Sequence, residues 1–291
     1  MRPLAEFVMR GKAQATLVAG IAAAIPILFW LSASAASLVL MRKGFQQAMP
    51  VIIAALVPAV VWAWIGDPYA LLMIGSTLVL AGVLRQSADW LKTLLASIAV
   101  GLAVAWILQS AFAEALSTLT TAFIAAMPQV LPELHGQLSD EELLRVQAVL
   151  PAVLTGLMAA AVQVMSLLSL MLGRHWQAVL YNPGGFADDF QRVRLPRLLA
   201  VMLVVVMFLG PSVSASLGAL MPLCAVVMVT AALSLIHGLV RKRQASGFWL
   251  VGLYAGVIFL SQFVLPLLVL LALIDSLMDF RGLKASSKDA S

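Results

Sequence analysis

The acidic pair Asp275 and Asp279 is the feature of this sequence whose spacing best suits chemistry. Residues four apart on a helix lie on one face, so the two carboxylates could share a cation. One such pair indicates a metal site only weakly, and pairing with Arg281 or the basic cluster 241–243 is the simpler interpretation. We therefore predict no metal site and regard Asp275, Asp279 and Arg281 as candidate partner-docking residues.

Motifs typical of enzymes are missing from the sequence. It has no His-Glu-x-x-His, no Gly-x-Ser-x-Gly, no glycine-rich phosphate loop followed by lysine and no Cys-x-x-Cys. The histidines His135, His175 and His237 are dispersed, and Cys224 is the single cysteine. We predict no catalytic, cofactor-binding or metal residue, no cofactor, and a protein that is not an enzyme.

The composition is that of a membrane protein. Hydrophobic residues make up 63% of the chain and charged residues 11%, whereas soluble domains are about a quarter charged. The mean hydropathy is +1.03. The net charge of +5 lies in short clusters between apolar runs, which is typical of topology determinants rather than of a nucleic-acid surface. We expect the lipid bilayer as a partner and no nucleic acid.

Apolar segments long enough to cross a membrane follow one another along the chain. A helix needs about 20 apolar residues to cross the ~30 Å hydrocarbon layer. The sequence therefore predicts an all-α, polytopic transmembrane helix bundle within a single domain, 1–283, followed by a flexible tail, 284–291. The eight apolar segments are 13–41, 45–65, 68–84, 91–110, 151–173, 198–217, 219–240 and 247–280.

The charges between the spans predict the orientation, because cytoplasmic loops carry an excess of Lys and Arg. If the turn 66–68 is external, Arg145 alone among the loop cations lies outside. The loop cations on the cytoplasmic side are Arg42, Lys43, Arg85, Lys92, Arg174, Arg192, Arg194, Arg197, Arg241, Lys242 and Arg243. Placing both termini inside adds six more basic residues to that side, so we expect a multi-pass protein with both termini cytoplasmic.

The first and last apolar segments, 13–41 and 247–280, must then fold back on themselves. Both are longer than one crossing requires, and each has a proline near its middle, Pro26 and Pro266. Proline removes a backbone donor and favours a break. We expect short helical hairpins at both ends of the chain.

The segment 111–150 is the expected external loop. Its apolar residues recur at helical spacing, so we predict amphipathic helices resting on the outer surface. Ser139 followed by Glu142 is a capping box, which predicts a helix starting at Asp140. The loop is either structural or a lid over a pocket.

A cytoplasmic interfacial helix is predicted over 186–195. Phe186 and Phe190 fall on one helical face after the turn sequence 182–185, and acidic residues precede basic ones along it. This helix is either a solvated connector or a surface on which a partner docks through Phe186 and Phe190.

Neutral polar residues are the candidates for lining a cavity. No ionisable residue lies deep in a central span, which disfavours a proton-driven transporter. Gln163 falls near the middle of its span, and a buried amide must find either a neighbouring helix or a bound ligand. Gln163, Gln262, Trp62 and Trp106 are the predicted cavity or ligand residues.

Small residues recur every fourth position in the first helix, at Ala15, Ala19 and Ala23. This spacing lets two helices approach closely. The contact is either with a partner subunit or within the chain.

Three stretches, "NPGGFADDFQRVRLP", "HGLVRKR" at 237–243 and "LIDSLMDFRG" at 273–282, resemble the YybS-like family of bacterial inner-membrane proteins of unknown function. That family distantly resembles the substrate-binding membrane subunits of energy-coupling-factor vitamin transporters. The resemblance implies a bacterial inner-membrane location. It also implies that Ala15, Ala19 and Ala23 pack on a membrane coupling subunit.

Two functions are compatible with these features. The first is a transport component for a small or vitamin-like solute, which needs a partner to supply energy. The alternative is a non-transporting membrane scaffold or assembly factor that binds a partner through its cytoplasmic segments.

Overall fold

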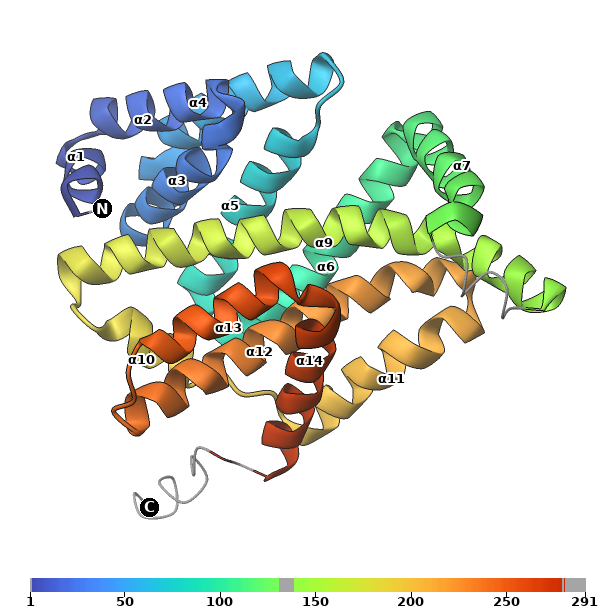
Figure 1. The fold of residues 1–291 in the computed structure, drawn as a ribbon. Helices are drawn as coiled ribbons and strands as arrows, with labels where there is room; N and C mark the ends of the chain where they lie inside the picture. The colour runs from blue at the N-terminus through green and yellow to red at the C-terminus, as the bar shows by residue number, and fades with distance from the viewer. Residues whose placement is uncertain (1, 131–138, 279, 281–291) are drawn as a thin grey trace.

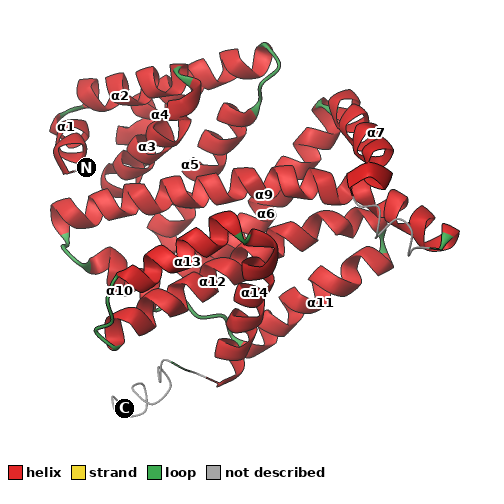
Figure 2. Ribbon diagram, in the orientation of Figure 1, coloured by secondary structure: helices red, strands yellow, loops and turns green. Residues whose placement is uncertain are grey.

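The computed structural model describes residues 2–130, 139–278 and 280 of the chain. These residues are almost entirely helical, and they include no β-strand (Figure 2). The predicted all-α fold is therefore confirmed.

Helices joined by short turns make up the described part of the chain (Figure 1). In chain order they are α1 (Arg2–Arg10), α2 (Lys12–Ala24), the 3₁₀ turn η1 (Pro26–Leu28), α3 (Phe29–Lys43), α4 (Phe45–Trp64), α5 (Tyr69–Ser87), α6 (Trp90–Ala111), α7 (Ala113–Val130), α9 (Asp140–Tyr181), α10 (Gly185–Gln191), α11 (Arg197–Val213), the 3₁₀ turn η2 (Ala215–Ala219), α12 (Leu220–Lys242), α13 (Phe248–Phe259) and α14 (Ser261–Met278).

Six of the described helical stretches are long and apolar enough to cross a membrane. They are Phe45–Trp64, Tyr69–Ser87, Trp90–Ala111, Glu141–Tyr181, Ala215–Lys242 and Ser261–Met278. Arg197–Val213 and Phe248–Phe259 are shorter apolar helices. These are the helices of an integral membrane protein, as the composition predicts.

The first apolar segment does fold back at its proline. The helix α2 ends at Ile25, whose backbone is extended, and Pro26 opens the turn η1 before α3 begins. The returning helix packs on α2, and the hydroxyl of Ser32 donates to the carbonyl of Ala19 at 2.8 Å. The hairpin predicted from Pro26 is confirmed.

The last apolar segment also breaks, but the position predicted from Pro266 is wrong. The chain leaves helical geometry at Leu260, between α13 and α14, and Pro266 lies inside α14. Pro266 is the sixth residue of α14, so it removes one backbone hydrogen bond from the second turn without ending the helix. The segment is therefore the short helix α13 followed, after Leu260, by α14, which is long enough to cross a membrane.

The longest helix, α9, crosses the whole molecule (Figure 1). Its 42 residues span about 63 Å, roughly twice the hydrocarbon layer. The capping box predicted at Ser139 and Glu142 is present and starts the helix at Asp140. The helix continues through Pro151 to Tyr181. Its second half contains the polar residues Gln163, Ser166, Ser169 and Gln177.

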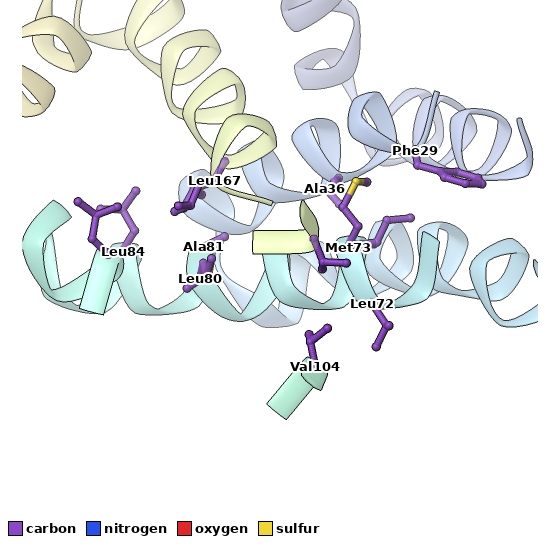
Figure 3. Packing of buried hydrophobic residues seen from close by; sticks show 14 of the residues in the cluster. Phe29, Ala36, Leu72, Met73, Leu80, Ala81, Leu84, Val104 and Leu167 are labelled. Carbon is purple, nitrogen blue, oxygen red and sulfur yellow. The ribbon is translucent and has the colours of Figure 1, made fainter. Parts of the chain in front are cut away.

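Four helices form the tightly packed centre, α3, α5, α6 and α9, which we call the four-helix unit. Each of α3 and α6 packs on both α5 and α9, and α5 also packs on α9. Figure 3 shows Ala36, Met73, Leu80 and Leu167 from this unit among the buried apolar side chains. Small residues permit the closest approach, since a Cβ built on Gly173 would lie 2.2 Å from the Ser37 hydroxyl.

The basic loops meet at one end of the bundle, which we call the basic end. Arg85 donates to the carbonyls of Leu40 and Met41 at the end of α3. Further side-chain pairs join the loops there, namely Arg42 with Tyr181, Arg174 with Asp189, and Arg241 with Asp188. The turn between α4 and α5, which has no basic residue, lies away from this end (Figure 1). The grouping of the charges agrees with the count made from the sequence.

Candidate functional site

The four predicted cavity residues do not come together. Gln163 is buried, with 3% of its surface exposed. Trp62 is half-buried, and its ring contacts that of Phe29 with the centroids 6.1 Å apart. Gln262 and Trp106 lie on the outer surface, where Trp106 is 70% exposed. Among these residues, only Gln163 belongs to the buried centre.

Gln163 is part of a buried line of neutral polar side chains, which we call the polar seam. The seam consists of Thr77 on α5, Ser97 on α6, and Gln163, Ser166 and Ser169 on α9. The Gln163 amide nitrogen donates to the Ser97 hydroxyl at 2.7 Å. The seam therefore lies where three helices of the four-helix unit meet.

Backbone carbonyls satisfy most hydroxyls of the seam. Ser97 donates to the carbonyl of Leu94 at 2.6 Å, and Ser166 donates to that of Met73 at 3.2 Å. Thr77 also donates to the Met73 carbonyl, at 2.8 Å. These hydroxyls bind helix backbone both within and across helices, as polar residues in membrane helices commonly do.

Two polar atoms of the seam have no such partner. Among the described residues, nothing hydrogen-bonds the carboxamide oxygen of Gln163 or the hydroxyl of Ser169. Leaving a buried polar atom unbonded costs about 1–3 kcal/mol. The seam thus keeps unused hydrogen-bonding capacity in the interior of the bundle.

A hollow of about 310 Å³, which we call the arginine pocket, lies at the basic end. It is lined by Met41, Leu84, Arg85, Ala88, Trp90, Arg174, Gln177 and Asp189. These residues come from α3, α5, α6, α9 and α10, and Ala88 from the turn after α5. The four helices of the central unit therefore all reach the pocket.

Both arginines of the pocket are held in place by hydrogen bonds. Arg85 donates through one terminal nitrogen, Nη1, to the Leu40 carbonyl at 3.2 Å and the Met41 carbonyl at 2.8 Å. Arg174 pairs with Asp189 at 2.6 Å, and its side chain is 18% exposed. Because the carboxylate neutralises only one guanidinium, the charged lining residues leave an excess of one positive charge.

The aromatic face of α10 packs on Trp90, which lines this pocket. The ring of Trp90 lies 5.9 Å from that of Phe186 and 6.5 Å from that of Phe190, centroid to centroid. The helix predicted over 186–195 ends at Gln191, so it is shorter than expected, and Val193 lies buried beyond it. Phe186 and Phe190 are half-buried against the bundle and do not form a free apolar face.

The seam and the pocket lie along the same face of α9. Gln163, Ser166 and Ser169 are followed at helical spacing by Gly173 and Gln177, and Gln177 lines the pocket. The rise of an α-helix places Gln177 about 21 Å beyond Gln163 along the axis. The seam and the pocket thus share one face of α9, with the close contact of Gly173 and α3 between them.

The small-residue face of α2 is used inside the chain. Ala15, Ala19 and Ala23 are buried, and α2 packs on both α3 and α4. A Cβ built on Gly20 would lie 3.5 Å from the carbonyl oxygen of Ala54. This face is therefore covered by α3 and α4.

The acidic pair near the C-terminus is described only in part. Asp275 is buried, and its backbone carbonyl accepts hydrogen bonds from Arg194 at 2.8 and 3.2 Å. Arg197 donates to the carbonyl of Leu277 at 3.0 Å. Asp279, Arg281 and the tail 284–291 lie outside the described residues.

Sequence reasoning missed the arginine pocket. In the sequence, Arg85 and Arg174 are used only to predict the membrane orientation, and Trp90 is not singled out. The three residues come from separate helices, so no spacing in the sequence connects them. The sequence shows that Arg85 and Arg174 each lie near the end of an apolar helix. Whether the two side chains come close together depends on how α5 and α9 pack.

The seam and the pocket present groups that can hydrogen-bond a polar ligand. Among the described residues, no group of three His, Cys, Asp or Glu side chains could hold a metal ion. No protein-family model, no curated protein and no solved structure matches the chain. The resemblance to the YybS-like family therefore stays a prediction, and the chain is described by what its helices form, an integral membrane bundle with a polar seam and an arginine pocket.

Proposed function

We propose that this protein is the membrane-embedded component of a transport system for a small solute. The observation that carries the proposal is the polar seam, which runs within the four-helix unit towards the arginine pocket. Hydrogen bonds between its members help to hold the helices together, but the Gln163 carboxamide oxygen and the Ser169 hydroxyl make no such bond among the described residues. Polar groups with unused capacity provide successive sites for a polar ligand.

A neutral polar solute fits the seam best. Thr77, Ser97, Gln163, Ser166 and Ser169 carry no charge and offer both donors and acceptors. A charged solute would meet no counter-charge among them, and bare charges deep in a membrane cost several kcal/mol. In this structure the seam is buried, so the solute would enter when the helices around Ser169 separate.

Energy for such a cycle would come from a partner. The sequence has no glycine-rich phosphate loop, so it lacks the usual nucleotide site. The distant resemblance to energy-coupling-factor systems supports a coupling subunit. We propose further that the basic end faces the cytoplasm of a bacterial inner membrane, with both termini on that side, because basic loops are retained there.

Water access to the seam tests the proposal. Ser169→Cys and Leu168→Cys, each made in a Cys224→Ala background, place a thiol on a buried and on an exposed face of α9, about 100° apart around the axis and at nearly the same depth. Ser169 is 2% exposed and faces the seam, whereas Leu168 is 53% exposed on the outer surface of the bundle. Membranes are treated with a positively charged, impermeant methanethiosulfonate, and the mass shift is followed with time.

We expect Ser169→Cys to be labelled at least about tenfold faster than Leu168→Cys, because thiolates react in water and not in lipid. Gln86→Cys, exposed at the basic end, controls for reagent access. If Ser169→Cys stays as unreactive as Leu168→Cys while Gln86→Cys reacts, the seam is a permanent packing feature. The transport proposal would then give way to the membrane scaffold.

A further inference from the structure

The arginine pocket has the composition of an anion site. Its charged lining groups are Arg85, Arg174 and Asp189, which together leave one unneutralised guanidinium. Asp189 pairs directly with Arg174, so the excess charge lies on the Arg85 side of the hollow. An anion with a single negative charge would balance it.

Arg85 presents a guanidinium that is both fixed and partly unused. Its Nη1 atom is committed to the carbonyls of Leu40 and Met41, which set the direction of the side chain. Both of these hydrogen bonds use Nη1, and the residue as a whole is exposed. A guanidinium fixed on one side offers its other donors to a ligand without first losing the freedom of a loose side chain.

Trp90 of α6 lines the same hollow. The residue is 4% exposed, and its indole N–H has no acceptor among the described residues. The edges of Phe186 and Phe190 hold its ring from the α10 side. The two arginines that share this lining favour a ligand rich in acceptor oxygens.

We propose that the arginine pocket binds a phosphate group. The oxygens of a tetrahedral phosphate point in several directions, so they can accept from guanidiniums on different helices, whereas a planar carboxylate pairs best with a single guanidinium. The two arginines lie on α5 and α9. A phosphodiester carries one negative charge, which equals the excess in the pocket.

The phosphate has two possible sources, a phospholipid headgroup or a phosphorylated solute. The pocket lies among the basic loops at the ends of apolar helices, and basic pockets between membrane helices attract lipid headgroups. Bound there, the phosphate would join α5, α9 and α10. The site does not depend on transport through the seam, and its test measures binding alone.

Thermal unfolding of the purified full-length protein in detergent provides the test. The protein is titrated with inorganic phosphate, with glycerol 3-phosphate, and with phosphatidylglycerol or diacylglycerol in mixed micelles. We expect a phosphate-bearing ligand to raise the unfolding midpoint, as any ligand of the native state does, and diacylglycerol to have no such effect. A rise with the soluble phosphates indicates a solute site, and a rise with the phospholipid alone indicates a headgroup site.

Variants then locate the site. Arg85→Gln removes the unneutralised charge, and Arg174→Gln combined with Asp189→Asn removes the ion pair without leaving a lone charge. We expect Arg85→Gln to weaken the apparent affinity at least about tenfold. Arg241→Gln is the matched control, because Arg241 lies at the same end, pairs with Asp188 and does not line the pocket.

Two results would overturn the proposal. One is the absence of stabilisation by every phosphate-bearing ligand. The other is an equal loss of affinity in Arg85→Gln and Arg241→Gln, which would mean that the ligand responds only to the overall charge of the basic end. Should Arg85→Gln fold poorly, the Arg174→Gln, Asp189→Asn double variant keeps the question answerable, since its affinity must also fall by more than that of Arg241→Gln.

Discussion

The four-helix unit and the C-terminal pair α13 and α14 are similarly apolar, yet they pack very differently. In α5, which belongs to the four-helix unit, 56% of the residues in an apolar stretch of 18 residues are buried. In α14 the corresponding share is 22%, and α13 has no buried residue at all. Hydropathy alone therefore does not decide how firmly a helix joins the bundle.

The difference lies in small and polar residues. Gly173 lets α9 approach α3 at Ser37, and Gln163 bonds Ser97 across to α6. By contrast, α13 presents Phe248 and Phe259 outward, 77% and 83% exposed. Lipid tails are as apolar as leucine, so they solvate such side chains as well as another helix would. Close approach and hydrogen bonds, rather than apolarity, hold membrane helices together.

The largest expected effect comes from a side chain at the tightest crossing. Gly173→Leu would place a Cβ 2.2 Å from the Ser37 hydroxyl and 2.9 Å from the Ser34 carbonyl oxygen. Because the clash is partly with backbone, α3 and α9 must separate, which we expect to cost about 3 kcal/mol or more. Thermal unfolding followed by size-exclusion chromatography measures the loss.

Gly252→Leu in α13 is the matched control. A Cβ there meets no heavy atom within 4 Å, and leucine is the better helix former by about 1 kcal/mol. We expect its unfolding midpoint to equal or exceed that of the unchanged protein. Equal destabilisation by both substitutions would remove the distinction between the two regions.

A medium effect is expected where α14 is attached. Arg194 donates to the carbonyls of Asp275 and Ser276 near the end of that helix. Hydrogen bonds from charged groups contribute about 1.5–3 kcal/mol, so Arg194→Gln should loosen the end of α14 while the four-helix unit keeps its stability. Amide hydrogen exchange of the peptide 268–278 should then rise at least about tenfold.

The comparison variant for this prediction is Arg145→Gln. Arg145 pairs with Glu141 at 2.6 Å, but both side chains are about three-quarters exposed. Exposed pairs contribute about 0–1 kcal/mol, so exchange should be unchanged. Faster exchange in both the 268–278 peptide and α9 after Arg194→Gln would show that α14 is integral to the central packing.

The smallest stability effect is expected in the polar seam itself. Gln163→Leu keeps nearly the same volume and removes the carboxamide oxygen that has no hydrogen-bond partner. The Ser97 hydroxyl still donates to Leu94, so we expect the free energy of unfolding to change by less than about 1 kcal/mol. Labelling of Ser169→Cys should nevertheless slow in this background, because the seam loses its central polar group.

A large loss of stability in Gln163→Leu would contradict this expectation. It would show that the hydrogen bond from the Gln163 side-chain amide to the Ser97 hydroxyl holds α6 to α9. The polar seam would then be explained by helix association alone and would no longer support the transport proposal.

Local signals in the sequence were good guides to the helices. The break at Pro26 and the start of α9 at Asp140 each depend on a residue and its immediate neighbours, so pattern reasoning finds them. Pro266 shows the limit of that reasoning. The chain breaks six residues earlier, at Leu260, while Pro266 remains inside α14, so a proline removes a hydrogen bond without always ending a helix.

For the candidate site, the sequence predicted only how deep a residue lies in the membrane. Gln163 was expected in the middle of its span and is buried there, but Gln262 and Trp106, grouped with it as cavity residues, face outward. Position along the chain gives the depth of a residue in the membrane. It does not give the direction in which the side chain points around the helix axis, and a cavity requires both.

The sequence by itself determined that this chain is a bundle of apolar helices and that its basic residues gather at one end, because the length of an apolar run and the position of charges act segment by segment. Only the tertiary structure decided that Arg85, Trp90 and Arg174 surround one hollow, and that the small face of α2 is covered by α3 and α4. The reason is that lipid and protein interior are equally apolar. Hydrophobicity therefore places a helix in the membrane without specifying which of its faces meets a neighbour.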